Sequence, residues 1–199
     1  MASSRSAPQS AFVLHQWDWS ETSLILDLFT REQGRVAAVA KGAKRPYSQL
    51  RPVLMPFQRL LVLTTRPKAD EHADILLLRS AEYAGAGAAL PPSRLFPGFY
   101  LNELLMKLLA RGDPHPALFD AYADALQALA VAPDEAPLRA FELLLLRETG
   151  VLPELSRTTT TQEVVQPARH YRLSGDSGLV VAADEAAHLP GSLCIALQA

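Results

Sequence analysis

Near residue 90 the spacing of the apolar residues changes, and this change limits the folds that the chain can adopt. Before it, short apolar runs of strand length are separated by turn-like residues. After it, apolar residues recur at i, i+3, i+4 and i+7, which is the spacing of a helix with one buried face. Pro91-Pro92 lies between the two regions and favours neither pattern. The chain of 199 residues is therefore predicted to be α+β, with a strand-rich part followed by a helical part.

The first part contains five apolar runs that are predicted to form strands. They cover 11–16, 22–30, 34–40, 57–64 and 74–83. The turn-like Glu32-Gln33-Gly34 predicts a hairpin between the second and third, and the fourth is expected to pair with the fifth. Such a set suits a small barrel or a sandwich, and a five-stranded OB-fold barrel is the natural candidate. OB-fold barrels commonly bind single-stranded nucleic acid, so we assign 11–90 to an OB-fold DNA-binding domain. The small, polar 1–10 is assigned to a disordered tail.

The second part, 91–199, is predicted to be a helical domain with three antiparallel helices. Apolar stripes lie within 99–109 and 118–129, and a third helix is expected between Pro137 and Gly150. Two short apolar runs flank Ser174–Gly178 and predict a small β-hairpin inserted in this domain. Apolar residues continue almost to the last position and need a partner, so we expect the helical domain to be truncated at its C-terminus.

The net charge of −2 conceals an uneven distribution of charged residues. The stretch 33–69 contains no Asp or Glu. It contains eight cations: Arg35, Lys41, Lys44, Arg45, Arg51, Arg59, Arg66 and Lys68. The remainder therefore carries 11 cations and all 21 acids. A basic segment on an acidic body favours binding to a polyanion, most often nucleic acid. The alternative is a solvated face whose acids come from elsewhere in the fold.

Within this stretch, 41–56 is predicted to be an exposed loop, because one glycine and three prolines interrupt regular structure. Cations and the aromatic Tyr47 in an acid-free loop suit contact with phosphates and stacking on bases. An ordinary exposed loop is the alternative reading.

Motifs for catalysis or metal binding are absent from the sequence. The five histidines are scattered, and HExxH, GxSxG, CxxC, a P-loop and GxGxxG are missing. The single cysteine, Cys194, lies among apolar residues and is predicted to be a buried thiol. We therefore expect no catalytic residues, no metal, no cofactor and no enzyme activity. No apolar run approaches the ~18 residues that span a bilayer and no secretory signal is present, so we expect a cytoplasmic location and no membrane partner.

Several segments, taken in order, resemble the RecO family of bacterial recombination mediators. They are Trp19–Thr30 (WSETSLILDLFT), Gly34–Arg45 (GRVAAVAKGAKR), Phe99–Leu105 (FYLNELL), Asp113–Tyr122 (DPHPALFDAY) and Pro137–Gly150 (PLRAFELLLLRETG). The resemblance implies an N-terminal OB-fold followed by a helical domain, in agreement with the reading above. It also implies DNA repair and recombination in the RecF pathway, and association with the nucleoid.

The resemblance implies three kinds of partner. These are single- and double-stranded DNA, RecR, and the acidic C-terminal tail of single-stranded-DNA-binding protein (SSB). The resemblance implies that the protein anneals complementary strands and, with RecR, helps to load RecA onto SSB-coated single strands. We expect DNA to contact Arg35, Lys41, Lys44, Arg45 and Arg51. Leu138 and Arg139, in the segment PLRAFE, match the part of the family that binds the SSB tail. Arg139 could instead be a helix-surface arginine near Glu142 and Asp134.

The sequence departs from the family pattern in two places. Some relatives carry a cysteine-rich zinc loop after the third helix, whereas 156–166 contains no cysteine, so no zinc is expected. Typical members also continue beyond this C-terminus with a basic helical segment. Three other functions stay open: an OB-fold adaptor that binds proteins and touches nucleic acid weakly, an unrecognised enzyme, and an OB-fold factor that prefers RNA.

Overall fold

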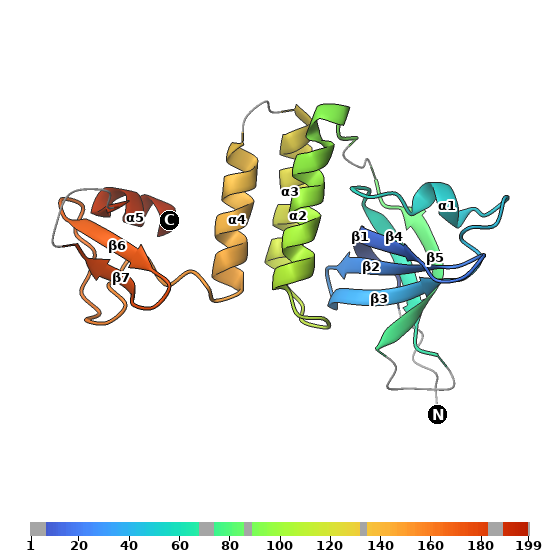
Figure 1. Ribbon diagram of the computed structural model, residues 1–199, viewed down its shortest axis with the longest axis horizontal. Coiled ribbons are helices and arrows are strands. Elements are labelled where there is room, and N and C mark those ends of the chain that lie inside the picture. The colour runs from blue at the N-terminus through green and yellow to red at the C-terminus, as the bar shows by residue number, and fades with distance from the viewer. Residues whose placement is uncertain (1–6, 68–73, 86–88, 132–134, 183–188, 199) are drawn as a thin grey trace. The chain divides into compact units, whose positions relative to one another are not determined.

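The computed structural model describes residues 7–67, 74–85, 89–131, 135–182 and 189–198 (Figure 1). The chain forms two compact units, 1–144 and 145–199, and each is described by itself. The first unit contains the strand-rich part and the first helices. The second contains a small sheet and the last helix.

A closed five-stranded barrel forms the first part of unit 1, with the strand order β1-β2-β3-β5-β4. The strands are β1 (Gln9–Asp18), β2 (Leu24–Thr30), β3 (Gly34–Ala40), β4 (Leu60–Thr65) and β5 (Ile75–Tyr83). The β3–β5 pair is parallel and the other pairs are antiparallel. The predicted OB-type barrel is therefore confirmed, as are the hairpin of β2 with β3 and the pairing of β4 with β5.

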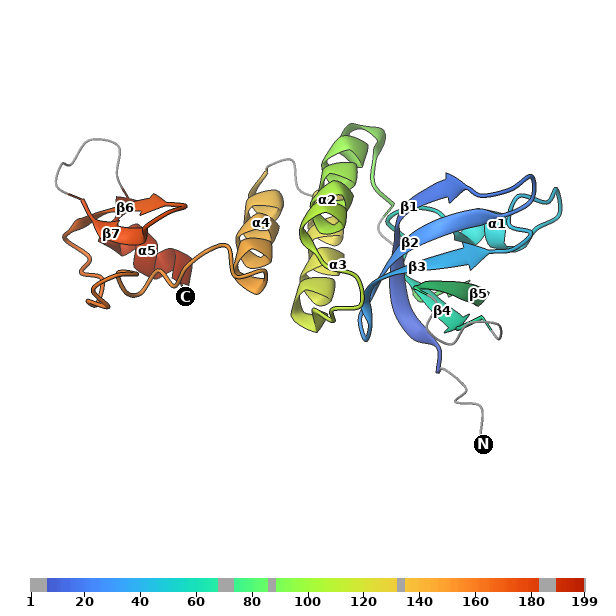
Figure 2. The ribbon, with the colours of Figure 1, turned by 60° about the horizontal axis from the view of Figure 1, so that its bottom comes forward.

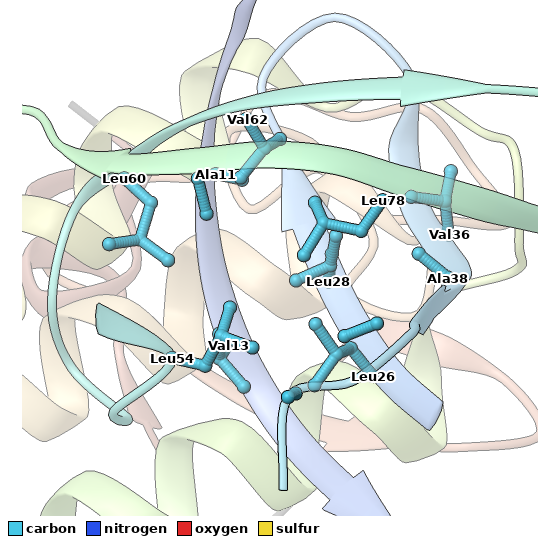
Figure 3. Close-up of a cluster of buried hydrophobic side chains, with 13 residues drawn as sticks. Ala11, Val13, Leu26, Leu28, Val36, Ala38, Leu54, Leu60, Val62 and Leu78 are labelled. Atoms are coloured by element: carbon cyan, nitrogen blue, oxygen red, sulfur yellow. The ribbon is translucent and has the colours of Figure 1, made fainter. Parts of the chain in front are cut away.

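Side chains that point alternately inward and outward along each strand form the interior of the barrel. Figure 3 shows Leu26 and Leu28 of β2 pointing inward with Leu60 and Val62 of β4. Leu61, between the last two, is 40% exposed. Residues that alternate along a strand point to opposite faces, so the pattern in the sequence fixes which side chains enter the core.

Two details of the secondary structure differ from the prediction. Strand β1 begins at Gln9, not at Ala11, because Gln9 and Ser10 pair with Val62 and Leu61 of β4. Gln9 and Ser10 are thus not part of a disordered tail, and residues 1–6 of that tail lie outside the described residues. The loop between β3 and β4 contains one short helix, α1 (Leu50–Val53).

Three helices follow in unit 1: α2 (Leu95–Leu108), α3 (Pro116–Val131) and α4 (Ala136–Glu148), whose last turn belongs to unit 2. A 3-10 turn at Pro92–Arg94 precedes α2. All three helices are confirmed, and the change from strands to helices lies at the expected place.

Aromatic rings join α3 to the barrel. Phe119 lies with its ring centroid 5.2 Å from that of Phe12 on β1 and 5.4 Å from that of Phe29 on β2. Phe12 also makes an edge contact with Tyr122, and all four rings are buried. The barrel and helices therefore share a core, although they come from sequence regions of different periodicity.

Buried polar groups at this junction bond to one another. The amide of Asn102 on α2 donates to the backbone carbonyl of Leu14 at 2.9 Å, and the hydroxyl of Tyr122 donates to the Asn102 carbonyl oxygen at 2.5 Å. Burial raises the pKa of Tyr122, so the phenol stays protonated and can donate. These bonds set the position of α2 against β1, because a buried donor or acceptor left without a partner is costly.

The turn between β2 and β3 also contacts the helices. Gly34 has φ +66°, and a Cβ placed there would lie 1.8 Å from the backbone oxygen of Asp113. Arg31, in the same turn, donates to Asp120 of α3 through two nitrogens at 3.0 and 2.9 Å. The hydrogen bond from Arg31 holds the pKa of Asp120 below its ordinary value. At position 34, the positive φ and the close approach of the Asp113 backbone both require a glycine.

Unit 2 is a three-stranded sheet with the order β7-β6-β8. Its elements are β6 (His170–Ser174), β7 (Gly178–Val181), β8 (Leu189–Pro190) and α5 (Gly191–Gln198). The expected hairpin is confirmed as β6–β7. The core of unit 2 contains Leu155, Tyr171, Leu179 and Cys194. Burial raises the pKa of the Cys194 thiol, as expected for a buried structural cysteine.

Threonine side chains hold the segment 156–166 of unit 2. The hydroxyl of Thr158 accepts from the backbone N–H of Glu163 at 2.9 Å, and the Thr159 hydroxyl accepts from that of Leu179 at 2.9 Å. Side-chain-to-backbone hydrogen bonds of this kind stabilise turns.

Candidate nucleic-acid interface

We call 41–56 the basic loop. It begins at the end of β3 and lies beside the loop between β1 and β2. Both loops are at the end of the barrel away from α2 and α3 (Figures 1 and 2). The backbone N–H of Lys44 donates to the carbonyl of Thr22 at 3.0 Å, and its ammonium donates to the carbonyl of Ser20 at 3.2 Å. The fold therefore places the acid-free segment next to a second loop, which comes from a different part of the sequence.

Four of the five predicted DNA contacts belong to this loop region. Lys41, Arg45 and Arg51 are exposed, and no carboxylate within the described residues forms an ion pair with them. Lys44 is half-buried and forms an ion pair with Asp18, Nζ to Oδ2 3.0 Å. The Asp18 side chain is 77% exposed, so solvent screens this pair strongly. The loop region keeps a positive charge that is open to solvent.

The fifth predicted contact, Arg35, lies elsewhere. It is near the start of β3, and its Nε donates to the buried Asp27 at 3.0 Å. Its Nη1 donates to the backbone carbonyls of Met106 and Leu109 at the end of α2. The structure does not bring Arg35 together with the other four cations, because its guanidinium is used to connect the barrel to a helix.

The other cations of the acid-free stretch also differ in position. Arg59 is half-buried, donates to Ser10, and lies with its guanidinium carbon 5.7 Å from the centre of the Phe119 ring. Arg66 contributes to a cleft of 720 Å³ with Arg35 and Arg111, where Glu32 and Asp74 are also present. Lys68 lies outside the described residues. The cations of the acid-free stretch are therefore divided among a solvent-exposed loop, a mixed-charge cleft and the half-buried position of Arg59.

Exposed aromatic side chains accompany the basic loop. Tyr47 is 94% exposed and lines an open hollow of 560 Å³ with Arg51 and Met55. Trp19, in the β1–β2 loop, is 62% exposed, and Trp17 at the end of β1 is 42% exposed. Tyr47 was predicted from the sequence, whereas the two tryptophans were not. The β1–β2 loop of an OB-fold commonly contacts oligonucleotides, and the aromatic residues on either side of Asp18 could have been found from that rule.

The predicted SSB-tail residues lie on α4. Leu138 is buried, and Arg139 is exposed. Arg139 donates to Glu135 at 3.0 Å and to Glu142 at 2.7 Å, and these bonds raise its pKa. This geometry agrees with a helix-surface arginine, although the acid partners are Glu135 and Glu142; Asp134 lies outside the described residues.

An apolar groove of 620 Å³ lies between α3 and α4. Its lining residues are Ala121, Asp124, Ala125, Ala128, Ala136, Pro137, Ala140, Phe141 and Leu144. Leu138 and Arg139 are not among them, because they lie on other faces of α4. The groove is lined mostly by small side chains, which leave room for a bulky apolar group.

The described ranges contain neither a metal-binding cluster nor a membrane-spanning helix. No cluster of three or more His, Cys, Asp or Glu residues there is arranged to hold a metal ion. None of the helices in those ranges has the length and hydrophobicity needed to span a membrane.

Comparison with known proteins assigns the chain to a family. The model of the recombination protein O N-terminal domain matches residues 5–79, and that of the C-terminal domain matches 92–198. The DNA repair protein RecO of Verminephrobacter eiseniae is 50% identical over 201 residues, covering 99% of this chain and 79% of that protein. The protein of the same name from a Polaromonas species is 48% identical, covering 100% of this chain and 79% of the relative. The two domain models together cover most of the sequence, and the chain belongs to the recombination protein O (RecO) family.

Proposed function

We propose that the protein acts in DNA repair and homologous recombination of the RecF pathway by binding DNA and annealing complementary strands. The observation that carries this proposal is the open positive charge of Lys41, Arg45 and Arg51 beside exposed aromatic rings at one end of an OB-type barrel. Relatives that are about 50% identical over nearly the whole chain are named DNA repair protein RecO, which supports the same assignment.

Annealing of this kind requires no bond chemistry. Two complementary strands repel each other through their phosphates, and cations on the protein offset that repulsion while displacing bound counterions. The exposed rings can hold bases apart from their neighbours until a complementary strand arrives. The protein would then act as a binding surface and not as an enzyme, in the cytoplasm and at the nucleoid.

Partner proteins would direct this activity to gaps in DNA. We infer binding to RecR, with which the protein would help to load RecA, and binding to the acidic tail of SSB through Leu138 and Arg139. Arg139 would have to exchange Glu135 or Glu142 for a carboxylate of the tail. The neighbouring α3–α4 groove could receive an apolar side chain of the same tail.

The DNA proposal is tested by replacing Lys41, Lys44 and Arg45 with alanine. Each phosphate contact on a single strand contributes about 0.7 to the slope of log affinity against log salt. We therefore expect the variant to bind single strands at least ~10-fold more weakly at low salt, with a slope shallower by about 2. Fluorescence anisotropy with a labelled oligonucleotide, measured across a salt series, gives both quantities.

A matched control removes three cations outside the loop. Lys107, Arg157 and Arg172 are exposed in the structure, so the change to alanine alters net charge equally without touching the basic loop. This control is expected to bind DNA nearly as the parent does. Salt-independent binding by the parent chain, or equal losses in the two triple variants, would show that the loop is not the DNA site. The adaptor alternative predicts intact partner binding and little change in DNA affinity.

The SSB-tail proposal predicts a defect that depends on SSB. Arg139→Ala is expected to slow annealing of SSB-coated complementary strands several-fold, while annealing of naked strands is unchanged, because the carboxylate partner is lost and the DNA surface is intact. Arg157→Ala, which removes an exposed arginine of unit 2, is the control. Equal rates for Arg139→Ala and the parent on coated strands would leave Arg139 as a helix-surface residue only.

A further inference from the structure

The helices cover only part of the outer face of the barrel. Phe12 and Phe29 are paired across β1 and β2 and lie buried against Phe119. Further along β2, Asp27 pairs with Ala37 of β3, and both are buried. Beyond this level the outward-facing residues become accessible to solvent, so the cover ends part of the way along the strands.

The accessible residues form one row across four strands. Trp17 pairs with Ile25, Ile25 with Val39, and Val39 with Leu77. Directly paired residues point to the same side of a sheet, and the neighbours Leu24, Leu26 and Leu76 belong to the interior. We call Trp17, Ile25, Val39 and Leu77 the outer row. Trp17 is 42% exposed and the other three are half-buried.

Cations lie at the end of this row. The carboxylate of Asp18, the residue after Trp17, forms an ion pair with Lys44, and Oδ2 lies 3.0 Å from Nζ. Lys41 directly follows β3, two positions beyond Val39, and is exposed. An apolar, aromatic strip beside an acid-free cationic loop matches the chemistry of a single strand, which offers both base faces and phosphates. A duplex does not offer its base faces, because they are stacked inside it.

We infer that the outer row is a base-stacking surface for single-stranded DNA, with Trp17 as the residue that distinguishes single strands from duplexes. Lys41 and Lys44 hold phosphates of the same strand. This inference rests on the proposed DNA binding and adds the part of the ligand that the row recognises. A protein surface or a second copy would cover an apolar strip equally well, but neither accounts for the exposed cation Lys41 beside it.

The test distinguishes the contribution of base contacts to affinity from that of phosphate contacts. Three probes of about 20 nucleotides are compared: oligo(dT), an abasic strand with the same phosphates, and a duplex. The parent chain is expected to bind oligo(dT) roughly tenfold more tightly than the abasic strand, and Trp17→Ala to abolish most of that difference. Binding of the abasic strand and the duplex should change less than about twofold, because the phosphate contacts are kept.

Two variants separate stacking from structural damage. Trp17→Phe keeps an aromatic ring and is expected to restore most of the preference for oligo(dT). Phe96→Ala removes a ring that is 85% exposed on α2 and should leave all three affinities unchanged. Because the chain has only two tryptophans, Trp19→Phe leaves Trp17 as the single emitter. Its fluorescence should be quenched by oligo(dT) and not by the abasic strand.

The outcomes are distinguishable from failure of the DNA proposal itself. A parent chain that binds none of the three probes would overturn both. A parent that binds DNA, with Trp17→Ala retaining the full preference for oligo(dT), would overturn the stacking surface alone. Equal losses for all three probes in Trp17→Ala would assign the residue a structural role and overturn it as well.

Discussion

Phe119→Ala is expected to lower the free energy of unfolding of unit 1 by about 3–5 kcal/mol. Phe119 is fully buried, and its ring packs against Phe12 and Phe29 of the barrel. Truncation leaves a cavity at the junction of α3 with β1 and β2, which the rigid strands can fill only in part. The barrel should therefore lose stability although the substitution lies in a helix.

Tryptophan fluorescence makes this measurement specific. Both tryptophans, Trp17 and Trp19, belong to the barrel, so urea unfolding followed by their emission reports that part of the chain. Phe96→Ala is the matched control, because its ring is 85% exposed and its loss should change stability by less than about 0.5 kcal/mol. If the fluorescence midpoint stayed in place while the helical circular dichroism was lost at lower urea, the barrel would fold independently of α3.

The shared core is also where sequence reasoning reached its limit. Alternation of apolar residues predicted the strands, and in the run 57–64 it places Leu60, Val62 and Thr64 on one face, where all three are buried. The same alternation places Phe12 and Phe29 outside the barrel, and nothing local in the sequence shows that a helix covers them. The partner ring, Phe119, is 90 residues beyond Phe29 and 107 beyond Phe12, and periodicity carries no information on such long-range contacts.

The candidate site was predictable to a different extent. The absence of acids in 33–69 identified the loop cations Lys41, Lys44 and Arg45, because loop residues are exposed in most folds. The same absence of acids did not distinguish these loop cations from Arg35. The sequence does not show that the side chain of Arg35 forms an ion pair with Asp27 in the folded chain. Asp27, a single acid within the apolar run LILDLFT, was the signal that a buried cation partner must exist.

Arg35→Ala is expected to lower the free energy of unfolding of unit 1 by about 3 kcal/mol and to leave DNA affinity nearly unchanged. Asp27 is fully buried, and Arg35, with 15% of its side chain exposed, is its closest cation. Removing Arg35 leaves the carboxylate with a longer bond, 3.3 Å, from the half-exposed Arg111. It also removes the donors to the carbonyls of Met106 and Leu109.

Two further variants distinguish a buried ion pair from a DNA contact. Arg111→Ala removes the exposed partner of Asp27 and should cost less than about 1 kcal/mol. Replacing both Asp27 and Arg35 by leucine and methionine removes the two charges together, and is expected to restore most of the stability lost in Arg35→Ala, since no buried charge is then left unpaired. Urea unfolding and oligonucleotide anisotropy are measured on each variant. Normal stability with a large loss of DNA affinity in Arg35→Ala would return Arg35 to the DNA surface, and would show that the bond to Asp27 contributes little to the fold.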